Sequence, residues 1–203
     1  MKPTLRILAL ALAALLTPVA APAKPATQTI VLAGGCFWGM QGVFERLRGV
    51  TDTTVGFSGG SAATAHYDVV SGGATGHAES IRIVYDPRTI SFEQLLDVYF
   101  LVAHDPTQLD RQGPDDGPQY RSAIFYTTAA QRSASLAYIA RLAQRHVYNA
   151  AVVTQVVAFR AFYPAEAYHQ HYMDHNPYDP YIVFNDRPKV ADLEKRFPLL
   201  VKR

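Results

Sequence analysis

The stretch that decides the fold runs from residue 29 to residue 47 and reads TIVLAGGCFWGMQGVFERL. Its first five residues, Thr29 to Ala33, are β-branched or apolar and stop at two glycines, which predicts a short strand. From Phe37 onward the apolar residues recur at helical spacing, and this spacing predicts a helix as far as Leu47. A strand, a glycine turn and a helix therefore follow one another directly, and the single cysteine, Cys36, lies at the junction.

The rest of the chain continues this alternation. Periodicity and turn residues predict further strands over 50–57, 81–85, 122–126 and 152–159, and helices over 91–103 and 128–146. The first six elements match the ferredoxin-like split βαβ arrangement, an α+β two-layer sandwich with helices on one face of a sheet. Residues 160–203 are expected to wrap the sheet as irregular chain, with one helix around Glu166 to Met173.

Composition places the chain among globular proteins and excludes several kinds of site. Apolar residues make up 49% of the 203 residues and charged residues 18%, so a disordered or low-complexity chain does not fit. The length favours a single domain. One cysteine cannot form an intramolecular disulfide, a Cys-based zinc ribbon or a CxxC redox pair.

The first 23 residues predict a secretory signal peptide. Lys2 and Arg6 precede an apolar run from Ile7 to Leu16, and Ala21-Pro22-Ala23 offers small residues for cleavage. A membrane anchor is the alternative, but about ten apolar residues are too few to span roughly 30 Å of hydrocarbon. We therefore expect export across the inner membrane to the periplasm, and one domain over 24–203. Cleavage lowers the formal charge from +2 to 0, which gives no reason to expect nucleic acid or a membrane surface as partner.

Cys36 is the sharpest candidate for chemistry. It follows two glycines and opens a helix, where unpaired backbone N–H groups and the helix dipole favour an anion. That position would lower the pKa of the thiol and make it reactive, and the glycines at 34, 35 and 39 would let a substrate approach the backbone. The alternative is a small buried hydrophobe, which is what a lone cysteine most often is.

The string GCFWG at 35–39 resembles the signature of the peptide methionine sulfoxide reductases of type A. The resemblance continues in family order from about residue 29 to residue 185. Its blocks are GFSGG at 56–60, TGHAE at 75–79, YDP at 85–87, HDPTQ at 104–108, RQG at 111–113, QYRS at 119–122 and YHQ at 168–170. A single five-residue string could be chance, but an ordered series of this kind is specific.

This resemblance implies a reaction and assigns its residues. Cys36 would attack the sulfur of a methionine sulfoxide, of the S epimer, while Glu79 donates a proton to the sulfoxide oxygen. Tyr67 and Tyr120 match the tyrosines whose hydroxyls bind that oxygen. A sulfoxide oxygen leaves poorly, so attack needs a proton donor and fixed hydrogen bonds. Glu79 would then need a raised pKa, which an apolar pocket provides.

Three further residues follow from the same resemblance. Phe37 and Trp38 match the aromatic residues that bind the methyl group of the substrate, and Asp115 matches a loop aspartate that supports the site. Without the surrounding match, Glu79 would be a solvated carboxylate at a strand edge, and the two tyrosines would be ordinary core or surface residues. No metal and no bound cofactor are implied.

The chain departs from many relatives after the catalytic blocks. Those relatives carry later cysteines near a glycine-rich C-terminus that attack the sulfenic acid formed on the first cysteine. This chain has Asn176-Pro177, Pro180-Tyr181-Ile182-Val183 and Pro188-Lys189-Val190 there, and resembles the members that lack those cysteines. Regeneration must then come from an external thiol, thioredoxin-like, glutaredoxin-like or small, and the substrates would be oxidised proteins or free methionine sulfoxide.

Two other readings of the sequence remain open. His169, His171 and His175 lie close together near Asp174 and could form a histidine metal site in an exported metal-binding protein. Alternatively, Cys36 could be the acyl nucleophile of a cysteine hydrolase with His77 or His104 as its base.

Overall fold

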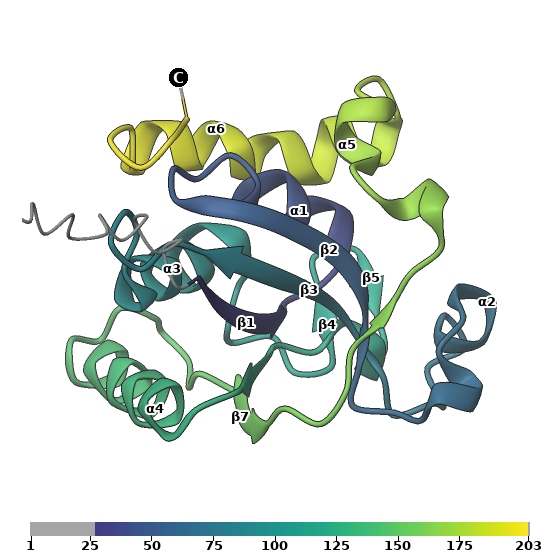
Figure 1. Cartoon of the computed structure of the whole chain (residues 1–203), viewed down its shortest axis with the longest axis horizontal. Coiled ribbons are helices and arrows are strands. Elements are labelled where there is room, and N and C mark those ends of the chain that lie inside the picture. Colours follow the sequence, from purple (N-terminus) through teal and green to yellow (C-terminus); the bar gives the residue numbers. More distant parts are fainter. Residues whose placement is uncertain (1–26, 203) are drawn as a thin grey trace, which may run out of the picture.

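A six-stranded sheet forms the centre of the molecule (Figure 1). The structure is a computed structural model that describes residues 27–202, so the predicted signal peptide lies outside the described residues. In sheet order the strands are β7 (Gln155–Ala158), β6 (Ala123–Tyr126), β1 (Gln28–Ala33), β3 (Ala78–Tyr85), β2 (Val50–Ser58) and β8 (Tyr163–Pro164). A separate hairpin joins β4 (Arg111–Gln112) to β5 (Asp115–Asp116).

Six α-helices and several shorter turns surround the sheet. The α-helices are α1 (Phe37–Phe44), α2 (Tyr67–Val70), α3 (Phe92–Val98), α4 (Ala129–Gln144), α5 (Tyr172–His175) and α6 (Arg187–Arg196). Single π-helical turns follow α3 at Tyr99–Ala103 and precede α6 at Ile182–Asp186, and 3₁₀ turns lie at Ala62–Thr64, Pro118–Tyr120 and Ala167–His169. Within residues 27–202, no helix combines the length and apolar character that a membrane crossing requires.

The strand order confirms the α+β fold class. β1 lies between β3 and β6 and is antiparallel to both, and β2 is antiparallel to β3. The order β6-β1-β3-β2 is the ferredoxin-like order expected for two interleaved βαβ halves. The fifth predicted strand, β7, extends this sheet parallel to β6 after α4, so the sheet is mixed.

One face of the sheet carries the main hydrophobic core. Alternate residues of three central strands, among them Ile30, Leu32, Ile83 and Ile124, pack against apolar side chains of α1, α3, α4 and α6. The opposite face is smaller: Val31, Ala33 and Phe125 are covered there by Phe159 and Phe162. The chain after β7 therefore wraps the second face, as the sequence predicts.

The helix predicted around Glu166 to Met173 is wrong. The chain forms a 3₁₀ turn at Ala167–His169, and α5 begins only at Tyr172. The helix is interrupted because His171 has φ +53, in the left-handed region. The residue before it, Gln170, is held against the sheet, because its side-chain amide accepts from Val55 N at 2.9 Å and donates to Val55 O at 3.0 Å.

The C-terminal segment is more regular than predicted. Irregular chain does follow β7, but residues 182–196 form a continuous π-turn and helix that Figure 1 shows beside α1. Pro188 does not break α6 because it lies in the first turn, where a missing N–H costs nothing. Leu193 is fully buried, and Val190 and Phe197 pack beside it on the main core.

Candidate active site

Cys36 lies at the N-cap of α1, immediately after β1. The turn before it depends on Gly35, whose φ is +89 and where a Cβ would lie 2.5 Å from the Gln112 side chain. The cysteine side chain is nearly enclosed, with 7% of its surface exposed. The sequence thus places the thiol correctly at the strand-to-helix junction, but in a buried environment.

The pKa of Cys36 does not follow the sequence expectation. Burial raises it well above the ordinary thiol value, and the carboxylates of Glu79, Asp186 and Asp115 raise it further. The backbone N–H of Trp38, in the first turn of the helix, acts in the opposite direction but is outweighed. The prediction of a lowered thiol pKa is therefore wrong for the free protein, because desolvation exceeds the effect of the helix terminus.

Glu79 lies beside Cys36. It is on β3, is 3% exposed and accepts a hydrogen bond from the backbone N–H of Phe37 at its Oε2, at 3.0 Å. Burial raises the carboxyl pKa to about 8; the Phe37 N–H lowers it, and Asp115 and Asp186 raise it. Glu79 is therefore mainly protonated at pH 7, which is the state that a proton donor requires.

Tyr67 and Tyr120 reach the same place from two different loops. Tyr67 opens α2, and Tyr120 ends the 3₁₀ turn after β5. Burial, and then the charges of Glu79 and Cys36, raise the pKa of Tyr67 to about 12. The pKa of Tyr120 is raised by burial, Glu79 and Asp115. Both hydroxyls therefore keep their protons and can donate hydrogen bonds near the thiol.

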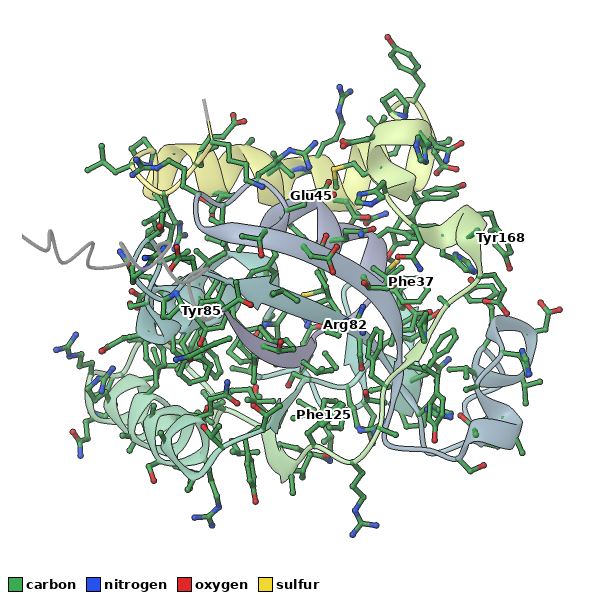
Figure 2. The ribbon with its side chains drawn as sticks, in the orientation of Figure 1. Phe37, Glu45, Arg82, Tyr85, Phe125 and Tyr168 are labelled. Atoms are coloured by element: carbon green, nitrogen blue, oxygen red, sulfur yellow. The ribbon has the colours of Figure 1, made fainter. Side chains whose placement is uncertain are left out.

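Two aromatic residues after Cys36 have different surroundings. Phe37 is fully buried among Phe57, Val55 and Val70, whereas Trp38 is only partly buried. Figure 2 shows Phe37 toward the end of the sheet where Tyr168 lies, and Tyr85 at the other end. The divergence of these neighbours agrees with the expectation that one of them lines a surface site.

The Trp38 indole is fixed by three contacts. It stacks on Tyr172 with ring centroids 3.8 Å apart, and it meets the edge of Tyr181 at 5.9 Å. Its Nε1–H donates to Nδ1 of the buried His169 at 3.1 Å. This bond assigns the ring proton of neutral His169 to Nε2, and it holds the indole in one orientation.

Asp115 is part of the site, and the segment after α5 adds residues that the sequence did not reveal. Burial raises the pKa of Asp115, and the Tyr181 hydroxyl donates to its Oδ2. Asp186 is fully buried and bonded to Lys189. Tyr181 and Asp186, and His169 from the helix expected around Glu166 to Met173, all come from the region 160–203. Only its high Tyr and His content was a signal.

The two alternative readings are not favoured. His169 accepts from Trp38, whereas His171 is exposed and lies 2.8 Å from Glu45. Within residues 27–202, no three His, Cys, Asp or Glu side chains are grouped to hold a metal ion. A cysteine hydrolase would need a histidine base beside the thiol. The His77 ring is instead hydrogen-bonded to Gly60 N and Ser61 O, and the His104 ring to Tyr99 O, so neither ring is positioned to accept a proton from Cys36.

Comparison with known proteins gives a consistent result. A family model described as peptide methionine sulfoxide reductase matches residues 28–199. A peptide methionine sulfoxide reductase MsrA 2 of Mesorhizobium japonicum is 50% identical over 178 residues, 88% of this chain and 91% of the relative. One of the same name from Synechocystis is 50% identical over 182 residues, 90% of this chain and 85% of the relative.

Two solved structures share the fold at substantial identity. Reduced Mxr1 from Saccharomyces cerevisiae superposes with a TM-score of 0.70 at 35% identity, covering 78% of this chain and 90% of that one. Methionine sulfoxide reductase A of Corynebacterium diphtheriae gives 0.66 at 35% identity, covering 78% and 80%. The chain therefore belongs to the peptide methionine sulfoxide reductase family, and it is a type A enzyme, an oxidoreductase that reduces methionine sulfoxide.

Proposed function

We propose that the enzyme reduces the S epimer of methionine sulfoxide by direct attack of Cys36 on the sulfoxide sulfur. The sulfur–oxygen bond of the substrate breaks as the oxygen passes to the cysteine sulfur. The substrate sulfur is reduced to a thioether, and the thiol sulfur is oxidised to a sulfenic acid. The thiol supplies one proton and the sulfenic acid carries one, so the step balances without another reactant.

One observation carries this proposal: a buried, protonated carboxyl lies beside the only thiol of the chain. Glu79 accepts from the N–H of the residue that follows Cys36, and its pKa is about 8. It can therefore give a proton to the sulfoxide oxygen as Cys36 attacks, and recover one from the thiol. A buried thiol with a raised pKa needs such a partner, because little free thiolate exists at pH 7.

The remaining residues hold the substrate in our scheme. The hydroxyls of Tyr67 and Tyr120 bind the sulfoxide oxygen and stabilise the charge that develops on it. Trp38, held by His169 and Tyr172, and the buried Phe37 form the apolar surface for the methyl group. Asp115 orients Tyr181, which meets the edge of the Trp38 ring.

Regeneration of Cys36 requires a thiol from outside the chain. A sulfenic acid condenses with a thiol and releases water, and a second thiol then frees the cysteine. The chain has one cysteine, so it cannot form an internal disulfide. A thioredoxin-like or glutaredoxin-like protein or a small thiol therefore completes the cycle, for oxidised protein or free methionine sulfoxide as substrate.

The test is a reductase assay on both sulfoxide epimers with each class of thiol reductant. We expect turnover of the S epimer alone. Cys36→Ser should abolish it, and Glu79→Gln should slow it by roughly 10²- to 10⁴-fold, the usual effect of a lost general acid. The matched control is Glu93→Gln, an exposed carboxylate paired with Arg141, which should react at the wild-type rate. Wild-type turnover by Glu79→Gln across pH 5 to 8 would remove Glu79 as the acid.

We also propose that residues 1–23 direct export and that one catalytic domain remains over 24–203. The charged start, the apolar run and the small residues before Lys24 support this. N-terminal sequencing of protein from a cell-envelope fraction should begin near Lys24. An intact Met1 on cytoplasmic protein would contradict the proposal.

A further inference from the structure

A buried ion pair lies against the first turn of α1, close to the reactive cysteine. Asp186 is fully buried at the end of the π-turn before α6, and Lys189 donates to its Oδ1 at 3.1 Å. A Cβ on Gly39 would lie 2.1 Å from that oxygen and 2.9 Å from Lys189 Nζ. The pair therefore rests on the backbone three residues after Cys36, at a position where only glycine fits.

The two charges of this pair change the pKa values of different groups. Beyond the main effect of burial, the carboxylate of Asp186 raises the pKa of three side chains, Cys36, Glu79 and Tyr181. Lys189 acts elsewhere: in addition to burial and hydrogen bonds, it lowers the pKa of Asp115 and of His104. Asp186 thus acts on the thiol and the acid, and Lys189 acts on Asp115 and His104, while burial and Asp115 raise the pKa of Asp186 itself.

Stability alone does not explain the pair. A buried ion pair loses about as much by desolvation as it gains by attraction, so apolar residues of similar volume would serve the fold as well. Here the second oxygen of Asp186, Oδ2, is also buried and has no hydrogen-bond partner within residues 27–202. An unpaired oxygen on a buried carboxylate is costly, and such costs are concentrated at functional sites.

We propose that Asp186 and Lys189 form a positioning pair, which directs negative charge at Cys36 and Glu79 so that both retain their protons until a sulfoxide binds. The other acidic groups that raise the Cys36 pKa are Glu79 on β3, which is mainly protonated at pH 7, and Asp115 on β5, so Asp186 is the largest source of negative charge among them at that pH. The benefit of this pair to the enzyme rests on the proposed function, whereas its electrostatic effect on Cys36 does not. The thiolate is the form that attacks peroxide and is oxidised, and this chain has no second thiol to rescue an oxidised Cys36.

The test is the pH dependence of Cys36 alkylation by iodoacetamide in the full chain, which needs no sulfoxide and no turnover. Asp186→Asn keeps the shape of the side chain but leaves the Lys189 charge alone. We expect its alkylation midpoint to move to lower pH, with a rate at pH 7 about tenfold above wild type, since one charge nearby shifts a pKa by about one or more. Inactivation by peroxide should accelerate in parallel.

Two further variants separate charge from packing. Asp186→Asn with Lys189→Gln removes both charges, so its midpoint should lie between those of the single variant and the wild type. Asp192→Asn is the matched control, because Asp192 also pairs with a basic residue of α6, Arg196, but is partly exposed to solvent. It should alkylate as the wild type does. A merely loosened site would lower the midpoint of the single and the double variant alike, because burial is the main cause of the raised pKa, whereas a charge effect separates the two variants.

The proposal is overturned if folded Asp186→Asn shows the wild-type midpoint. If that variant does not fold, the double variant decides alone, and a wild-type midpoint there overturns the proposal equally. The two proposals fail separately. A shifted midpoint in a protein that reduces no sulfoxide would refute the proposed function and leave this inference standing.

Discussion

Glu79→Gln should gain stability relative to the wild type as pH rises, while it removes the proposed proton donor. The carboxyl pKa is about 8 in the folded protein against 4.5 for an exposed glutamate. Between these values the unfolded chain releases a proton that the folded chain retains, so the unfolded state binds fewer protons. The free energy of unfolding therefore falls as pH rises from 4.5 to 8.

The size of this effect follows from the two pKa values. At about 1.4 kcal/mol per pH unit, the buried carboxyl costs the folded state roughly 3 kcal/mol at pH 7 and about 5 kcal/mol above pH 9, and nothing below pH 4. Glutamine does not ionise, and its carbonyl can still accept from the Phe37 N–H. The variant should therefore gain on the wild type as pH rises.

Urea unfolding at pH 4, 6 and 8 measures this gain directly. Any constant cost of the amide displaces the whole curve, so the prediction concerns the change with pH and not the value at one pH. Glu93→Gln is again the control, because this exposed carboxylate should give a nearly constant difference. If Glu79→Gln and wild type change in parallel from pH 4 to 8, the carboxyl is not held protonated by burial, and the basis for its role as acid fails.

Three other outcomes are expected. The reductase rate with saturating reductant should fall as pH rises through about 8, because Glu79 then loses its proton; a rate still rising at pH 9 would exclude it as the acid. A single-turnover assay without reductant should yield about one methionine per chain and leave the chain heavier by one oxygen, since one thiol is present; two methionines would show a second reducing group. Tyr181→Phe removes the hydroxyl bonded to Asp115, so turnover should fall by up to about tenfold, which corresponds to about 1.4 kcal/mol, while circular dichroism is unchanged; an unchanged rate would show that this hydrogen bond has only a structural role.

The sequence predicts the fold because local patterns and strand order agree. The run from Thr29 to Leu47 gives strand, turn and helix at nearly the observed bounds, and the alternation after it fixes the ferredoxin-like order. The same residues place Cys36 beside Glu79, because the backbone N–H of the next residue, Phe37, donates to the Glu79 carboxyl. What the sequence cannot give is desolvation, which depends on the completed core and reverses the expected shift of the thiol pKa.

The residues missed by the sequence analysis share one physical cause. Asp186, Tyr181 and His169 approach the site through tertiary contacts of a segment whose local pattern is weak. A left-handed residue at 171 interrupts the helix there, so the position of the segment is decided by packing on α1. Tyr67 and Asp115 were identified only because the family motif continues through their loops.

Side-chain amides of Gln170 and Gln41 bind the backbone of β2, and this affects how the molecule can pair with other chains. Gln170 bonds both backbone groups of Val55, and Gln41 reaches the carbonyl of Thr53, so side-chain amides stand where another strand would pair. An open strand edge is a template for aggregation. The oxidised proteins proposed as substrates can expose extended segments that would pair with such an edge. Because these amides and β8 already occupy backbone groups of β2, an extended substrate segment does not find that edge free to pair with.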